Sequence, residues 1–278
     1  MFALQYWRLP LRLRDNRCMA QPRPLAAITG ASSGIGATFA RRLARDGYDL
    51  LLIARRKERL EQLAAELPTA AEILVADLID GADLEAVARR LAAEPRLDLL
   101  VNNAGFGSQG RFWEADSQVE MHKLHVVATV ALSRAALQGM VARRRGAIIS
   151  VSSVAGFMQN PSSLSYNATK CWMNSFSEGL WLEMKASGLP IRIQSLCPGF
   201  TYTEFHDVAG VDRAAIPKPL WLTADYVVEE SLKALAQDRL FVVPGWRYKA
   251  IVWFFSWLPR SIQHAIMLKY GSRSRKTR

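Results

Sequence analysis

The sequence is poor in cysteine and has no long hydrophobic run. Its three cysteines, Cys18, Cys171 and Cys197, form an odd set without the spacing of a metal site, so neither a disulfide framework nor a bound metal is expected. A membrane-spanning helix needs about 20 apolar residues, and the longest candidate, residues 250–258, is far shorter. Arginines interrupt residues 1–24, which excludes a secretory signal there. A reducing, cytoplasmic setting is expected.

Acidic residues are fewer than basic ones, 25 against 36, and the net charge is +11. The excess lies at the two ends of the chain. Residues 1–24 carry +4 and residues 269–278 carry +5 without one acid, which leaves +2 for residues 25–268. A nucleic acid partner is therefore not expected for the folded part, while attraction of the ends to an anionic surface stays open.

Apolar runs alternate with amphipathic segments along the 278 residues, half of which are hydrophobic. This alternation is typical of a parallel sheet with helices on both faces, so a single α/β domain with a Rossmann-type, doubly wound sheet is predicted over residues 25–245. The predicted strands are 25–29, 49–54, 72–76, 97–101, 147–151, 191–196 and 240–243. The predicted helices are 37–46, 57–66, 83–93, 118–143, 166–186 and 224–236. Residues 1–24, in which Met19 is an alternative start, and residues 246–278 are predicted extensions.

A glycine-rich turn, Thr29-Gly30-Ala-Ser-Ser-Gly34-Ile-Gly36, links the first strand to the first helix. Gly30 permits a tight turn, Gly34 lets the backbone approach a phosphate, and Gly36 lets the helix pack closely on the sheet. The N-terminus of the helix favours an anion. The turn therefore predicts a pyrophosphate site. Its expected contacts are Gly30, Ser32, Ser33, Gly34, Ile35 and Gly36.

The spacing T-G-x-x-x-G-x-G resembles the short-chain dehydrogenase/reductase family, and further matches follow the later strands. The resemblance covers about residues 25–245 and implies that the residues after the third, fourth and sixth strands line the cofactor site. These are Asp77, Leu78, Asn103, Ala104, Gly105, Pro198, Gly199 and Thr203. Asparagine after a strand often only forms a turn, but several matches at the carboxyl ends of successive strands favour ligand binding.

The residues after the second strand predict the form of the cofactor. Ala54 stands where NAD-preferring relatives carry an acid, and Arg55 follows it. A guanidinium pairs with a 2′-phosphate through two parallel hydrogen bonds, so NADP(H) is expected. The alternative is that Arg55 and Arg56 are a solvated pair at the start of a helix.

Ser153, Tyr166 and Lys170 are the expected catalytic set, and Tyr166 and Lys170 also border the cofactor. The spacing Tyr-x-x-x-Lys places both side chains on one helical face, where a nearby ammonium is expected to lower the pKa of the phenol. The family resemblance implies that Tyr166 exchanges a proton with the substrate oxygen, that Ser153 donates to that oxygen, and that Lys170 binds the nicotinamide ribose. Ser152 is the alternative to Ser153.

The resemblance implies an NADP(H)-dependent carbonyl reductase or alcohol dehydrogenase, with a homo-oligomeric state expected by analogy. Residues 204–223 are irregular and rich in apolar side chains such as Val211, so they are expected to form a lid over a hydrophobic substrate. The aromatic, basic segment 246–278 is expected to pack on the domain or a second subunit, with peripheral membrane contact as the alternative. A catalytically weak NADP(H) sensor or scaffold is the alternative function.

One departure from the family pattern concerns the proton relay. Relatives usually have an asparagine in the long helix that holds a water of the relay, and His125 stands at this place. An imidazole can also donate and accept hydrogen bonds, so His125 is a candidate catalytic residue. A histidine of the core without a chemical role is the alternative.

His125→Asn is predicted to keep or raise turnover, because asparagine is the usual residue of the relay. Steady-state turnover with a panel of ketones, together with circular dichroism to verify the fold, checks this. A collapse of activity in the folded variant would show that His125 itself is used.

Overall fold

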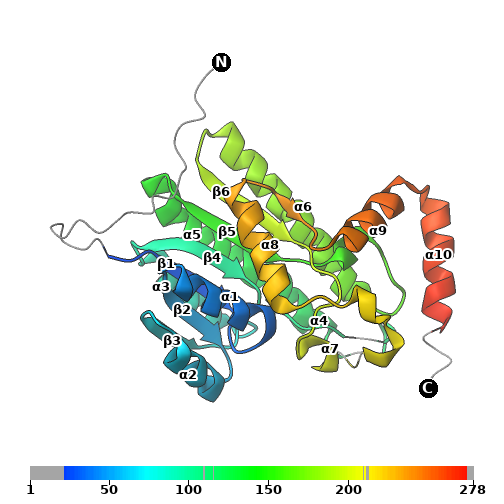
Figure 1. Cartoon of the computed structure of the whole chain (residues 1–278), viewed down its shortest axis with the longest axis horizontal. Helices are drawn as coiled ribbons and strands as arrows, with labels where there is room; N and C mark the ends of the chain where they lie inside the picture. Colours follow the sequence, from blue (N-terminus) through cyan, green and yellow to red (C-terminus); the bar gives the residue numbers. More distant parts are fainter. Residues whose placement is uncertain (1–21, 109, 115, 209, 211–212, 274–278) are drawn as a thin grey trace.

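The chain folds around one parallel sheet (Figure 1), as the computed structural model of residues 22–108, 110–114, 116–208, 210 and 213–273 shows. The strand order is β3-β2-β1-β4-β5-β6-β7. The strands are β1 (Leu25–Thr29), β2 (Asp49–Ala54), β3 (Ala71–Val75), β4 (Leu97–Asn102), β5 (Gly146–Val151), β6 (Ile191–Leu196) and β7 (Phe241–Val242). The predicted Rossmann-type fold is confirmed. The order reverses between β1 and β4, which is where sheets of this kind bind ligands.

Helices cover both faces of the sheet, because its central strands are apolar on both sides. In β1, Ala26 and Ile28 join the apolar cluster under one layer, whereas Leu25 and Ala27 join the cluster under the other. The first layer consists of α1 (Gly34–Arg45), α2 (Lys57–Glu66) and α8 (Ala224–Ala236). The second consists of α3 (Gly81–Ala92), α5 (Ala128–Arg143) and α6 (Leu164–Ala186). Helix bounds differ from the predicted ones by a few residues at the N-termini.

The long helix predicted at 118–143 contains an irregular turn. It begins as α4 (Gln118–His122), passes through a π-helical turn, η1 (Lys123–Val127), and continues as α5. By length and composition this helix is apolar enough to cross a membrane, which the search for an uninterrupted apolar run missed. It packs instead as a core helix on α3, β4 and β5.

Two regions differ from the sequence prediction. The predicted irregular lid contains short helices, α7 (Phe205–Val208), η3 (Arg213–Ala215) and η4 (Lys218–Leu220). The C-terminal segment forms α9 (Trp246–Trp257) and α10 (Arg260–Arg273), which project from one end of the sheet (Figure 1). Residues 1–21 of the predicted extension, Val211 of the lid and residues 274–278 lie outside the described residues.

Candidate active site

The hydroxyl of Thr29 joins the ends of β1 and β4. Its Oγ1 accepts the N–H groups of Asn103 and Ala104, each at 2.9 Å, and Asn103 Nδ2 donates to the carbonyls of Thr29 at 2.9 Å and Gly30 at 3.2 Å. The predicted Asn-Asn-Ala-Gly motif therefore holds the glycine-rich loop in place. Thr29 itself was not among the predicted site residues.

The three predicted glycines are required by geometry. Gly30 and Gly34 have φ angles of 65° and 54°, in the left-handed region that favours glycine. A Cβ on Gly36 would lie 2.4 Å from the Gly30 carbonyl oxygen, so Gly36 lets α1 approach the loop. The side chain of Ser33 does not cap α1, and the first turn contains no acid. The first N–H groups of α1 thus suit an anion such as a phosphate.

Arg56, rather than Arg55, lies against the glycine-rich loop. Its guanidinium donates to Ser32 Oγ at 3.0 and 3.2 Å and to Ser33 Oγ at 2.9 Å. The side chain of Arg55 is 70% exposed and lies 3.7 Å from the carboxylate of Asp77. The structure therefore does not bring Arg55, the residue predicted to bind the cofactor, to the loop. It brings Arg56 there instead, which the sequence analysis had named only as the solvated neighbour of Arg55.

An acidic residue of the lid pairs with two arginines at this corner. Glu204 pairs with Arg56 at 3.0 Å and also with Arg59 of α2. Hydrogen bonds from Arg59 and Arg56 lower the pKa of Glu204. Nearby, a Cβ on Gly34 would come within 3.0 Å of the Thr203 side chain. The segment that starts the lid thus lies directly on the loop, and neither Arg59 nor Glu204 had been predicted.

The predicted catalytic residues meet beyond the carboxyl end of β5. Tyr166 stands in the first turn of α6 and Lys170 follows one turn later, with Lys170 Nζ 5.7 Å from the centre of the Tyr166 ring. Ser153 begins a short 3-10 helix, η2 (Val154–Phe157), and forms a side-chain hydrogen bond with Tyr166. Ser152 Oγ instead donates to the Lys170 carbonyl at 2.9 Å. Of the two serines, Ser153 is the one that faces the phenol.

Burial dominates the protonation of the pair. Burial raises the pKa of Tyr166 to about 12, and the hydrogen bond with Ser153 only partly opposes it. Burial lowers the pKa of Lys170 to about 7, while its Nζ donates to the Val151 carbonyl at 2.7 Å. The pKa of Tyr166 is thus raised in the protein by itself, where the expectation from the sequence was that a neighbouring ammonium lowers it, because desolvation is the largest influence on the phenol.

His125 lies in the π-helical turn and is fully buried. Its Nε2 accepts the N–H of Phe106 at 3.3 Å, which leaves the proton on Nδ1, and Nδ1 donates to Thr169 Oγ1 at 2.9 Å. Burial, followed by the charge of Lys170, holds the pKa of His125 well below its ordinary value. Both nitrogens of a neutral ring are therefore engaged by the protein. A Cβ on Gly105 would lie 2.7 Å from Nε2, so that glycine makes room for the ring.

The predicted Pro198-Gly199 turn is bound to the C-terminal helices. A Cβ on Gly199 would lie 2.0 Å from the Tyr248 ring, so glycine is required there. Tyr248 Oη accepts the N–H of Phe200 at 2.9 Å and donates to the Leu220 carbonyl at 2.6 Å. Tyr248 of α9 therefore ties this turn to the end of the lid. No motif pointed to Tyr248, since an aromatic residue in an aromatic segment carries no signal of its own.

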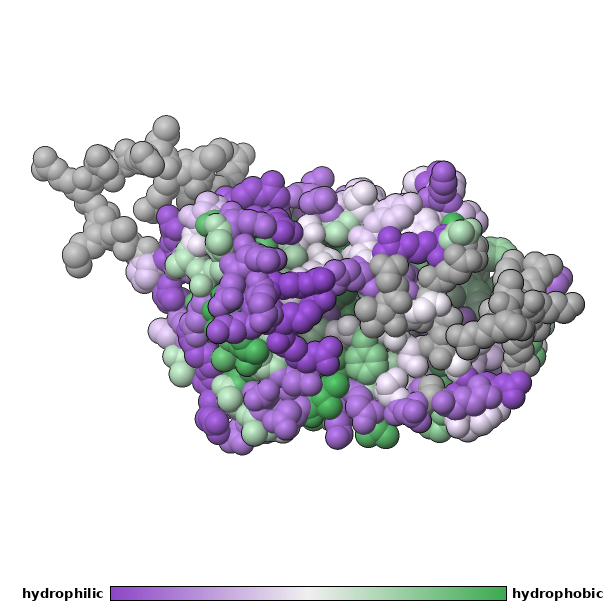
Figure 2. Space-filling model, turned by 90° about the horizontal axis from the view of Figure 1, so that it is seen from below, coloured by the Kyte–Doolittle hydropathy of each residue, from purple (hydrophilic) through white to green (hydrophobic). Residues whose placement is uncertain are grey.

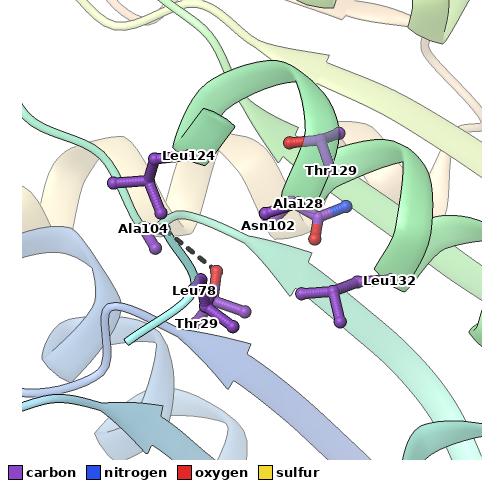
Figure 3. A pocket seen from close by; sticks show the side chains of 8 residues that line it. All are labelled: Thr29, Leu78, Asn102, Ala104, Leu124, Ala128, Thr129 and Leu132. Atoms are coloured by element: carbon purple, nitrogen blue, oxygen red, sulfur yellow. Dashed lines mark hydrogen bonds between the residues drawn. The ribbon is translucent and has the colours of Figure 1, made fainter. Parts of the chain in front are cut away.

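A separate crevice lies behind Thr29, between α5 and the end of β4 (Figure 3). Its lining residues are Thr29, Leu78, Asn102, Ala104, Leu124, Ala128, Thr129 and Leu132. It is too narrow to hold a ligand and lies apart from Tyr166 and Lys170. We interpret it as a packing gap beside the hydrogen bond between the Ala104 N–H and Thr29 Oγ1.

Comparisons with known proteins identify the family of this chain. The chain matches the short chain dehydrogenase family over residues 24–213. A short-chain dehydrogenase from Sphingobium yanoikuyae, solved in complex with NADPH, is 38% identical and superposes with a TM-score of 0.76, covering 82% of this chain and 92% of that chain. A bulky-bulky ketone specific alcohol dehydrogenase from Comamonas testosteroni is 28% identical with a TM-score of 0.72, covering 90% of this chain and 94% of that chain.

A very-long-chain 3-oxoacyl-CoA reductase from Anas platyrhynchos is 28% identical over 262 residues, which cover 90% of this chain and 80% of the relative. The family match spans more than half of the chain, and its oxidoreductase relatives align over most of their own length. The chain therefore belongs to the short-chain dehydrogenase/reductase family of oxidoreductases, which act on carbonyl and alcohol groups.

Proposed function

We propose that this protein is an NADP(H)-dependent oxidoreductase that interconverts a hydrophobic ketone and its alcohol, with Tyr166 as the acid and base. The observation that carries the proposal is the meeting of Ser153, Tyr166 and Lys170 at the edge of the sheet that also carries the glycine-rich loop, which suits a phosphate. When bound, the nicotinamide supplies or accepts the hydride. Ser153 and Tyr166 position the substrate oxygen, and Tyr166 transfers the proton.

Tyr166 serves as the proton donor during reduction. With a pKa of about 12, its phenol stays protonated at neutral pH and is ready to give its proton to the oxygen of a carbonyl group. Ser153 donates a second hydrogen bond to that oxygen and stabilises its developing charge. The position of Tyr166 in the first turn of α6 also favours the phenolate that remains, because the helix dipole is positive there.

His125 acts in this scheme as a positioning residue. Both of its ring nitrogens are engaged, by Thr169 of α6 and by the backbone of Phe106, and its ring lies edge-on to Tyr166 at 6.1 Å between centroids. It thereby joins the helix that carries Tyr166 to the segment that follows β4. This arrangement supports a neutral imidazole that orients α6 rather than one that relays a proton.

The preference for NADP(H) rests on Arg56. Its guanidinium lies over Ser32 and Ser33, at the carboxyl end of β2, and the last residue of that strand is Ala54 rather than an acid. Arg59 adds a second positive charge, and Glu204 occupies both arginines as an internal counter-ion. A 2′-phosphate would exchange for this carboxylate. The Sphingobium yanoikuyae relative, solved with NADPH, supports the same preference.

Aromatic side chains of the lid and of the segment after β4 support a hydrophobic substrate. Phe205 of the lid lies 5.7 Å from the Tyr166 ring, and Trp221 stacks on Tyr202 at 4.7 Å. Phe112 and Trp113, in the segment between β4 and α4, are exposed. Relatives that reduce long-chain 3-oxoacyl-CoA or act on bulky ketones are consistent with a large apolar substrate.

Tyr166→Phe is predicted to lower turnover at least about a hundredfold, because the general acid is lost, while cofactor binding persists. The measurements are NADPH oxidation with a panel of apolar ketones and NADPH binding by fluorescence titration. Tyr226→Phe on α8 is the matched control. Undiminished turnover in Tyr166→Phe would refute the role of the phenol, and NADPH binding without any ketone reduction by the wild type would favour a sensor.

Arg56→Ala is predicted to weaken NADPH binding about tenfold to a hundredfold, because charge-assisted hydrogen bonds contribute about 1.5–3 kcal/mol each. Binding of NADH should change little. Titration of both cofactors checks this, with Arg55→Ala as the matched control. A larger loss in Arg55→Ala would place the 2′-phosphate at Arg55, and equal losses for both cofactors would refute recognition of that phosphate.

Lys170→Met is predicted to stabilise the ligand-free protein at pH 7 by about 2–4 kcal/mol while it abolishes activity. The pKa of Lys170 is lowered to about 7 in the folded chain, from an ordinary value of 10.5. Between these two pH values, Lys170 is protonated in the unfolded chain and neutral in the folded chain. The wild-type free energy of unfolding should rise with pH through this window, and Lys170→Met should remove that rise. Urea unfolding from pH 7 to 10 tests this, with exposed Lys233→Met as control. An unchanged slope would contradict it.

A further inference from the structure

Helix α9 presents aromatic side chains on two opposite faces. Tyr248 and Phe255 are buried against the domain, whereas Trp246, Trp253 and Trp257 are 69%, 64% and 75% exposed. At 100° per residue the three tryptophans fall on one side of the helix and the buried pair on the other. Phe254, 60% exposed, widens the outer face. We call Trp246, Trp253, Phe254 and Trp257 the outer aromatic face.

The outer aromatic face is held outward by contacts on the inner side of α9. The two hydrogen bonds of Tyr248, to Phe200 and Leu220, fix the rotation of the helix about its axis. Gln263 of α10 donates to the carbonyls of Phe255 at 3.0 Å and Leu258 at 2.9 Å, and so fixes the corner between the two helices. The tryptophans therefore cannot turn inward without breaking these bonds.

The charge around the outer aromatic face has one sign. Residues 246–278 contain no aspartate or glutamate. Arg247 and Lys249 flank the tryptophans on either side of the helix, and Arg247 lies 4.9 Å from the Trp246 ring. Within the described chain, no ion pair joins Arg247, Lys249 or Arg260 to a carboxylate. Exposed tryptophan between cations is the pattern of helices that lie in the interface of an anionic bilayer.

The tryptophans of the outer aromatic face lie close together. The rings of Trp253 and Trp257 are 6.0 Å apart between centroids. On the side of the molecule seen in Figure 2, hydrophilic side chains predominate and hydrophobic ones form small separate patches. A continuous exposed aromatic surface marks a contact with a partner. A second copy of the chain is disfavoured as this partner, because a two-fold contact through α9 would bring Arg247 and Lys249 of both copies together without an acid to pair with them.

We propose that α9 and α10 dock on an anionic lipid bilayer. Trp246, Trp253 and Trp257 enter the headgroup region, and Arg247 and Lys249 pair with lipid phosphates. Ile262 and Leu268 of α10, 46% and 65% exposed, extend the apolar contact beyond the corner. Docking of this kind is reversible and depends on salt, since part of the attraction is between exposed charges. It does not rest on the proposed hydride chemistry.

The test uses the full chain and vesicles of phosphatidylcholine with or without phosphatidylglycerol. The protein is expected to sediment with the anionic vesicles, with a blue shift of tryptophan fluorescence, and to be released by salt. Bromine-labelled acyl chains should quench that fluorescence in the wild type, which tests insertion without any variant. Failure to bind the anionic vesicles at low salt would overturn the proposal.

Two variants separate the two parts of the contact. Trp253→Ala with Trp257→Ala, and Arg247→Glu with Lys249→Glu, should each weaken binding about tenfold or more. The controls are Tyr226→Ala on α8 for exposed aromatic surface, and Lys233→Glu on α8 with Arg239→Glu just after it for the same change in charge. These are called the α8 controls. NADPH oxidation with a water-soluble ketone should stay at the wild-type rate in all four.

The outcomes of the variants are decisive in both directions. Loss of vesicle binding in the α9 variants but not in the α8 controls supports docking through the outer aromatic face. An equal loss of vesicle binding in the α9 and α8 charge variants would show that net charge alone causes the attraction. It would refute docking through the outer aromatic face. A third outcome would assign the face to a second copy of the chain. In it, the wild type does not bind vesicles and sediments as a dimer, and Trp253→Ala with Trp257→Ala dissociates that dimer in sedimentation velocity.

Discussion

The arrangement of the candidate site depends on the hydrogen bonds of the Thr29 hydroxyl. It sits where the strand order reverses, and its single oxygen accepts two backbone N–H groups from the segment after β4. These bonds fix the glycine-rich loop relative to the Asn-Asn-Ala-Gly segment, and thereby the place of a dinucleotide relative to the chemistry. Gly105 of that segment in turn abuts His125, which is bonded to the helix of Tyr166. One side chain at the switch point thus links both halves of the sheet.

Two buried basic side chains of the candidate site, Lys170 and His125, lower the stability of the folded protein. Lys170 and His125 are bases that burial keeps from taking up protons, and both are more easily protonated in the unfolded chain. Each therefore destabilises the folded protein as the pH falls, Lys170 between 10.5 and about 7 and His125 below its ordinary value. Such groups concentrate at functional sites, because chemistry needs protonation states that water would not give. Among the described residues no carboxylate pairs with Lys170, and a buried amine in that situation is difficult to explain by packing alone.

The sheet was predictable because its strands are short apolar runs buried on both faces, and the motifs were predictable because they follow those strands. The lid helices escaped prediction because three or four residues show no helical periodicity. Helix α9 escaped for the opposite reason, since its aromatic residues lie on both faces and leave no amphipathic pattern. Arg55 and Arg56 could not be told apart, because neighbouring side chains leave a turn in different directions. The raised pKa of Tyr166 could not be predicted, because residue spacing reveals a nearby charge but not desolvation.

The close approach of the Tyr248 ring to Gly199 bears on how this chain could be shortened. Residues 246–273 look like an appendage in outline, yet one phenol from them fills the space that a side chain at 199 would need and satisfies two backbone groups of the turn and the lid. A chain cut after residue 245 would leave a trough over the turn and an amide and a carbonyl without partners. The C-terminal helices therefore cannot be removed without rebuilding the Pro198-Gly199 turn and the end of the lid.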